Sequence, residues 1–356
     1  MGGSVKHVAG VDTHKDTHSI AVIDRVGAVV AELTIAATVE GYAQAITRVT
    51  EFEGLVWGIE GTGSYGRGFV DELLRRGASV FDVPGSLTKR HRRNASRRGK
   101  SDVQDARAIA GVVLRESGRL GRCERSDEQE AVRVLYDRRD RLVHARTEAI
   151  NRIRAAALRL DVRELPAKLS NGVGLRKVHE AIDFLRGSSY TADALIAEIE
   201  EAVSDVERIS DRIRTLEKQI RPFVERLAAN LLTLNGASLV VAAGLIGHSG
   251  SLSNIRNAAA FAMRAGVAPV PCSSGKSKAV RVNTGGNRQL NRCLHVMALV
   301  QVRTAGHAGR VYYDRKRGEG KTHRAAMRAL KRQLATVVYY RLAESRRLME
   351  RPTAAA

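Results

Sequence analysis

One pattern constrains this chain more than any other: a heptad repeat through residues 195–227. Apolar residues recur there at alternating steps of four and three, which is typical of a coiled-coil helix. Residues 132–160 carry a weaker version of the pattern. The two helices can pair within one chain, as an ordinary amphipathic hairpin, or between chains. Because burying such a seam is favourable, we expect it to join chains into a dimer or larger oligomer. The repeat consists of Leu195, Ile199, Ala202, Val206, Ile209, Ile213, Leu216, Ile220, Phe223 and Leu227.

The segments on either side of this helical middle differ in character. The first ~125 residues alternate between short apolar runs and helical stretches, and a turn at residues 25–27 joins the second and third expected strands as a hairpin. After residue 230, glycines and small residues separate aliphatic helices. We therefore expect an α/β domain at 1–125, a helical coiled-coil segment at 126–227 and a mostly helical domain at 228–350. The expected strands are 7–11, 19–23, 28–35, 55–59 and 79–83.

The charge of the chain points to a polyanionic partner. Lys and Arg number 59 against 38 Asp and Glu, a net charge of +21. Such an excess favours nucleic acid, because each phosphate that a cation neutralises releases counterions. We expect salt-sensitive binding to duplex DNA and to structured RNA. The residues expected to contact nucleic acid are Lys89, Arg90, Arg92, Arg93, Arg97, Arg98, Lys100, Lys276 and Lys278.

Other features narrow the class of protein. Cys123, Cys272 and Cys293 lie far apart, which argues against a disulfide scaffold or a zinc ribbon. No apolar run reaches membrane-spanning length and no signal peptide precedes the first strand, so we expect a cytoplasmic protein without a membrane partner.

Four carboxylates stand at positions that can converge. Asp12 follows the first strand, Glu60 closes the fourth, and Asp102 and Asp105 lie in the first turn of a helix that Ser101 caps. Hard oxygen ligands of this kind suit Mg²⁺, which binds through a few carboxylates together with substrate phosphates. Each acid alone has a simpler explanation as a turn residue or as a partner of the helix dipole. Together, beside a basic segment, they predict a metal-dependent phosphoryl-transfer site.

Three further motifs leave alternatives open. Residues 61–66 match G-x-G-x-x-G after a strand, with Asp82 at the distance of a ribose-binding acid, so a dinucleotide-dependent oxidoreductase is one alternative. His14 and His18 flank Asp16, a spacing that would form a metal-binding face on a helix, but between two strands we interpret both as surface histidines. Residues 271–276 read as an exposed flexible loop in which a serine or Cys272 is a candidate nucleophile.

Taken together, these motifs resemble those of the DEDD transposases of bacterial insertion sequences. The N-terminal matches are specific and stand in the family's order, and the C-terminal ones are looser. The matching segments are Val8–Lys15, Gly58–Tyr65, Lys100–Ala106, Ala259–Ala262, Gly266–Pro269, Ser274–Gly275 and Gly286–Leu290.

The resemblance implies a RuvC-like N-terminal domain of the ribonuclease H type and a C-terminal transposase domain. It implies that Asp12, Glu60, Asp102 and Asp105 bind Mg²⁺ and that Ser274 attacks DNA, in one composite site for strand cleavage and exchange. It also implies guidance by a structured non-coding RNA, the bridge RNA, and assembly as dimers and tetramers.

Two departures from the family pattern affect these expectations. Residues 235–238 read Asn-Gly-Ala-Ser where the family usually has Pro-Gly-Ile-Gly, and residues 270–272 read Val-Pro-Cys before the serines. The second departure leaves Ser273 as an alternative to Ser274, which we prefer because it directly precedes the glycine. A non-catalytic nucleic-acid-binding scaffold is the other alternative function.

Overall fold

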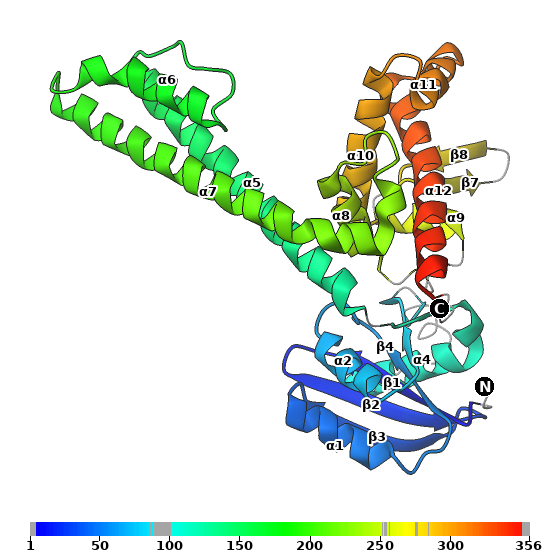
Figure 1. Ribbon diagram of the computed structural model, residues 1–356. Helices are drawn as coiled ribbons and strands as arrows, with labels where there is room; N and C mark the ends of the chain where they lie inside the picture. Colours follow the sequence, from blue (N-terminus) through cyan, green and yellow to red (C-terminus); the bar gives the residue numbers. More distant parts are fainter. Residues whose placement is uncertain are drawn as a thin grey trace, which may run out of the picture. The chain divides into compact units, whose positions relative to one another are not determined.

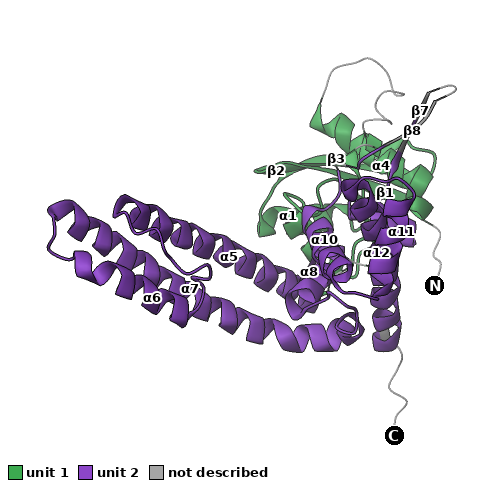
Figure 2. Cartoon of the chain, turned by 90° about the horizontal axis from the view of Figure 1, so that it is seen from above, with its two compact units in different colours: residues 1–126, 251–256 green, residues 127–250, 257–356 purple. Residues whose placement is uncertain are grey.

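The computed structural model describes residues 5–85, 87–88, 101–124, 126–250, 252, 255, 257–274, 277–283 and 285–350. The chain forms two compact units: residues 1–126 with 251–256, and residues 127–250 with 257–356 (Figure 2). The predicted division into three parts, with a boundary near residue 227, stays a prediction. Within the described ranges, no helix is both long and apolar enough to cross a membrane.

The first unit is built on a mixed sheet of six strands in the order β3-β2-β1-β4-β5-β6. Strands β1, β2 and β3 pair antiparallel, β4 and β5 run parallel to β1, and β6 is antiparallel to β5. This confirms the α/β class and the mixed sheet that the resemblance implies. The strands are β1 (His7–Thr13), β2 (Thr17–Asp24), β3 (Val29–Ala36), β4 (Leu55–Ile59), β5 (Val80–Asp82) and β6 (Gly121–Arg122).

Helices cover both faces of this sheet (Figure 1). Helices α1 (Val39–Val49) and α2 (Arg67–Arg75) enclose an aromatic core that contains Trp57 and Phe69. Helix α4 (Asp102–Glu116) packs on the other face through Ile109 and Val113. It begins where the sequence predicts, since the Ser101 hydroxyl accepts a 3.3 Å hydrogen bond from the Gln104 amide.

Two glycines set how closely α4 approaches the sheet. Gly10 of β1 and Gly58 of β4 are direct neighbours in the parallel pair. A Cβ added at Gly10 would lie 2.1 Å from the Ala106 carbonyl oxygen, and one at Gly58 would lie 2.3 Å from Val113. The helix backbone therefore rests directly on β1, and this close packing fixes the start of α4 relative to the end of β1.

The second unit begins with a long helical hairpin. Helices α5 (Asp127–Arg159) and α7 (Tyr190–Ala228) lie side by side, with α6 (Gly172–Ile182) at the far end (Figure 1). Ile199 and Val206 of the heptad are fully buried in one cluster with Ile153 of α5. Ion pairs Arg152–Asp205 (2.7 Å) and Arg139–Glu217 (2.8 Å) also join the two helices.

This hairpin corrects the expectation that the heptad joins two chains. From Leu195 to Ile220 every repeat residue is buried within a single chain, because α5 and α6 already fill the seam. Only Phe223 and Leu227, which both follow Pro222, remain partly exposed. The alternative of an internal hairpin is therefore the correct one for this seam.

The remainder of the second unit is helical apart from one hairpin. Strands β7 (Val270–Ser274) and β8 (Ser277–Arg281) pair antiparallel. The sequence predicted a loop across 271–276, so the strand assignment of residues 271–274 is a correction. The helices are α8 (Leu239–Ser249), α9 (Ala258–Arg264), α10 (Arg288–Arg303), α11 (Ala308–Gly318) and α12 (His323–Glu350).

Candidate active site

The site begins at the edge of the sheet where β1 and β4 end side by side. Asp12 lies near the end of β1 opposite Ser19, and its side chain is only 14% exposed. Glu60 follows β4 directly, and its amide donates a 3.2 Å hydrogen bond to the Val11 carbonyl. The Thr13 hydroxyl donates to the Glu60 carbonyl at 2.8 Å. These bonds hold the two acidic positions next to each other.

Helix α4 brings two more carboxylates to this edge. Because its backbone rests on Gly10, its first turn lies beside the end of β1. Asp102 is the first residue of the helix and is half exposed, whereas Asp105 is nearly buried. Parallel strand ends and a helix N-terminus therefore place four carboxylates in one region of the first unit.

His14 completes the closest group of potential metal ligands. Its Nε2 lies 3.3 Å from Asp12 Oδ2 and 3.4 Å from Asp102 Oδ1. One ligand atom from each of Asp12, His14 and Asp102 lies within 4.8 Å of the other two. Sequence reasoning missed His14, although it stands two residues after Asp12 at the end of a strand, where alternate residues share a face.

Glu60 and Asp105 lie outside this closest group. The Glu60 carboxylate faces Gly85, where an added Cβ would lie 2.4 Å from Oε1. Both acids are still near enough to Asp12 for their charges to raise its pKa. The structure thus gathers Asp12, His14 and Asp102 tightly and places the other two predicted ligands around them.

Electrostatics at Asp12 favour a bound cation. Burial raises the pKa of Asp12 above its usual value, and the nearby charges of Asp105, Glu60 and Asp102 raise it further, while His14 opposes them. A divalent cation would relieve this concentration of negative charge. The carboxylate oxygens fit Mg²⁺, whereas the imidazole nitrogen is a ligand more typical of transition metals.

We expect Asp12→Asn to raise the melting temperature of the metal-free protein by a few degrees. The folded pKa of Asp12 lies above its unfolded value, so the ionised form costs stability once the pH exceeds both values. At neutral pH the amide removes that cost, and each kcal/mol of stability regained raises the melting temperature by about 2–4 °C. Differential scanning fluorimetry with and without Mg²⁺ measures both this shift and the response to the ion.

The same measurement has a matched control and a clear contrary outcome. Wild type should gain stability in Mg²⁺, whereas Asp12→Asn should lose most of that gain. Asp16→Asn changes an exposed carboxylate nearby and should behave as wild type. An Asp12→Asn protein that melts lower without metal, or that keeps the full Mg²⁺ response, contradicts the assignment.

Two of the other interpretations do not fit the structure, although His14 is exposed as expected. His18 is fully buried and stacks on Tyr42 at a centroid distance of 5.7 Å, so it is a core residue and not a surface histidine. Asp82 accepts a 2.7 Å hydrogen bond from Thr62, within the loop proposed as a dinucleotide motif. That loop follows β4 in a mixed sheet, whereas a dinucleotide fold places it after the first strand of a parallel one.

The predicted serine stands at the tip of the β7–β8 hairpin. Ser274 ends β7 and pairs with Ser277, and Ser273 pairs with Lys278. The basic run from Lys89 to Lys100, and Lys276 at the hairpin turn, lie outside the described residues. Cys123 and Cys293 are poor nucleophiles, because burial raises the pKa of the first thiol to about 12 and of the second to about 11.

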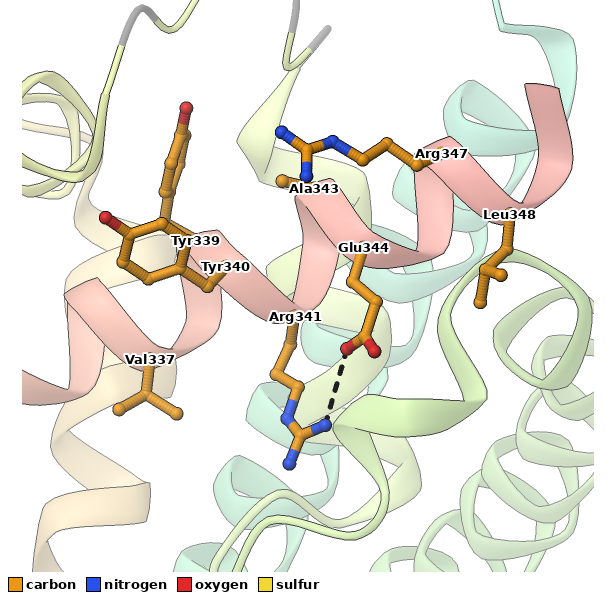
Figure 3. Close-up of a pocket in the computed structure, with 8 residues that line it drawn as sticks. All are labelled: Val337, Tyr339, Tyr340, Arg341, Ala343, Glu344, Arg347 and Leu348. Atoms are coloured by element: carbon orange, nitrogen blue, oxygen red, sulfur yellow. Dashed lines mark hydrogen bonds and ion pairs between the residues drawn. The ribbon is translucent and has the colours of Figure 1, made fainter. Parts of the chain in front are cut away.

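A hollow of about 760 Å³ lies beside α12, and the polar groups around it have a structural role (Figure 3). Its charged pair, Arg341 and Glu344, lies 3.4 Å apart. Asn230 donates hydrogen bonds to the Arg341 carbonyl and to Glu344 Oε2, at 2.9 and 3.1 Å. These groups hold the turn after α7 against α12. The lining residues are Val337, Tyr339, Tyr340, Arg341, Ala343, Glu344, Arg347 and Leu348.

Comparison with known proteins places this architecture in a family. A family model described as "Transposase", of the DEDD type, matches residues 9–160, and a model described as "Transposase IS116/IS110/IS902 family" matches residues 228–314. The two matches are consecutive and cover most of the chain. The chain therefore belongs to this family of insertion-sequence transposases, as the sequence motifs predicted.

Individual relatives agree with this assignment. The chain is 26% identical to the insertion element IS900 uncharacterized 42 kDa protein of Mycobacterium paratuberculosis, over 93% of this chain and 94% of that protein. It is 29% identical to the insertion element IS110 uncharacterized 43.6 kDa protein of Streptomyces coelicolor, over 74% and 75%. Among solved structures, T. thermophilus RuvC in complex with a Holliday junction substrate aligns with 32% of this chain and 92% of its own, at 13% identity and a TM-score of 0.25.

Proposed function

We propose that this transposase cuts and rejoins DNA strands by Mg²⁺-dependent phosphoryl transfer. Asp12, Glu60, Asp102 and Asp105 would hold the ion, and Ser274 would be the nucleophile. One observation carries the proposal. In a chain of a transposase family, Asp12 of β1 and Asp102 of α4 both lie next to His14. The pKa of Asp12 is raised by burial and by its acidic neighbours, which supports a role in cation binding.

The proposed reaction is an exchange of phosphodiester bonds at one phosphorus. A bond forms between the Ser274 oxygen and phosphorus, and the bond from phosphorus to one strand end breaks. The serine proton leaves to solvent, and the released strand oxygen takes one up. The four carboxylates would hold Mg²⁺, which would supply positive charge for the phosphate oxygens and lower the pKa of the attacking hydroxyl. Reversal with another strand end restores a diester, so no energy source is needed.

We further propose that a structured RNA encoded by the element guides the reaction and that the active form is a dimer or tetramer. The net charge of +21 supports binding of both RNA and DNA. Because the heptad seam is filled within one chain, the contact between chains must use another surface. Light scattering on the full chain measures the assembly.

Cleavage of DNA that carries the element ends tests the function. Supercoiled DNA with those ends, incubated with the protein and RNA transcribed from the flanking region, should be nicked in Mg²⁺ and intact in EDTA. Omitting the RNA should lower the yield. Binding without cleavage at any Mg²⁺ concentration would instead favour the alternative of a non-catalytic scaffold.

A further inference from the structure

Two adjoining hollows lie at the base of the β7–β8 hairpin. The larger, of about 690 Å³, extends from Pro269 and Arg281 to α12, and its volume is typical of a ligand pocket. The smaller, of about 360 Å³, lies against α10. They share Gly266, Asn283, Asn291 and Lys331 in their walls, and together we call them the basic pocket.

The transposase motifs after residue 260 build the frame of this pocket. Gly266 has φ +65°, and a Cβ added at Gly286 would lie 2.1 Å from the Gly266 nitrogen, so the two loops meet backbone to backbone. Asn291 donates hydrogen bonds to the Ala265 and Gly266 carbonyls, both at 3.1 Å. Asn283 donates to the Met263 carbonyl at 3.0 Å. These motifs thus shape a fixed concave surface beside the hairpin.

The charged residues that line the pocket are all cations, and one of them, Arg292, is paired with Asp140 at 2.6 Å. No Asp or Glu stands among its described lining residues. In the described part of the chain, no carboxylate lies within ion-pair distance of Arg281, Arg288, Arg328 or Lys331, whereas Arg310 pairs with Asp314 at 2.7 Å. The lining cations are Arg281, Arg288, Arg292, Lys321, Arg328, Lys331 and Arg332.

Lys331 stands between the two hollows in a fixed position. Its ammonium group donates a 2.7 Å hydrogen bond to Asn291 Oδ1, and its side chain is partly buried. Burial and the neighbouring charge of Arg328 lower its pKa. A buried ammonium is costly unless an anion pairs with it, so an incoming phosphate would relieve an existing cost.

We propose that the basic pocket binds the phosphodiester backbone of a nucleic-acid strand that leads to Ser274. The pair Val270–Arg281 at the base of the hairpin is four residues from the pair Ser274–Ser277 at its tip, or about 13 Å of strand. That length corresponds to about four nucleotides of a duplex strand. The proposal rests on the proposed function only in naming Ser274 as the point that the strand reaches.

The test is the salt dependence of binding in EDTA, where no cleavage takes place. The full-length double variant Arg328→Gln with Lys331→Gln should bind a short mixed-sequence duplex DNA at least about tenfold more weakly than wild type. The slope of log K against log salt should become shallower by roughly 0.9 for each phosphate that the variant no longer neutralises. Arg281→Gln, at an exposed rim position, should weaken binding in the same direction without any effect on the core.

A matched control separates the pocket from bulk charge. Arg176→Gln with Lys177→Gln removes two exposed cations from α6 of the same unit and should leave the slope almost unchanged. A single-stranded RNA probe of equal length shows whether the strand is DNA, RNA or either. If neither probe distinguishes the pocket variants from the α6 control, the proposal is overturned. Ser274→Ala should keep wild-type binding here, so a failure of the serine mechanism leaves this result intact.

Discussion

Asp102→Asn is expected to abolish DNA strand cleavage, lowering the rate by at least about 10³-fold, or about 4 kcal/mol of barrier. Asp102 is half exposed, and its carboxylate lies 3.4 Å from His14, opposite the carboxylate of Asp12. An amide keeps the size of the side chain but removes the charge that a divalent cation needs. DNA binding should stay within a few-fold of wild type, because the cationic surfaces are unchanged. Single-turnover nicking in Mg²⁺ measures the loss.

Glu40→Gln is the matched control for this change. Glu40 also stands in the first turn of a helix, α1, so its substitution removes the same favourable interaction with a helix dipole. Glu40 is not one of the four carboxylates of the candidate site, so the Glu40→Gln protein should cleave DNA at the wild-type rate. If Asp102→Asn retains more than a tenth of wild-type cleavage, Asp102 is not a metal ligand in the reaction.

Ser274→Ala is expected to eliminate the covalent protein–DNA adduct while DNA affinity is retained. A serine hydroxyl is a weak nucleophile that needs activation, and without it the protein has no oxygen at this position to bond to phosphorus. The adduct is measured on nicked DNA. Cleavage of this DNA releases one strand end, so the reaction cannot reverse and the covalent intermediate is trapped. Denaturing electrophoresis then separates protein joined to DNA from free protein.

Ser273→Ala is the control, since it changes the preceding residue of β7 in the same way. It should form the adduct at the wild-type level. The reverse result would make Ser273 the nucleophile. If both variants still cleave as wild type does, the covalent mechanism is wrong, and direct attack by water at the carboxylates becomes the better account.

Local sequence signals predicted much of the first unit. The runs at 7–11 and 55–59 appear as β1 and β4, and the Ser101 cap starts α4 as expected. These features depend on short-range patterns, which a sequence carries directly. His14 was missed because its role depends on α4 approaching β1 over Gly10, a contact between segments about ninety residues apart.

The second unit shows where such signals are insufficient. The heptad specifies an apolar seam but not the helix that fills it, because α5 and a second chain present the same kind of surface. The β7–β8 hairpin was expected as a loop, since Ser, Gly and Pro dominate residues 271–276. The basic pocket has no local signature at all, because α12 contributes several of its cations from more than forty residues beyond the hairpin.

The metal dependence of the covalent adduct tests the account most directly, because it joins the carboxylate site to the serine. Wild-type protein is incubated with nicked DNA and guide RNA, in Mg²⁺ or in EDTA, and the adduct is located by mass spectrometry of the digested protein. The account predicts a phosphodiester-linked nucleotide on Ser274 in Mg²⁺ and none in EDTA. Adduct of equal yield in EDTA, or efficient strand exchange in Mg²⁺ without any serine-linked DNA, would contradict it.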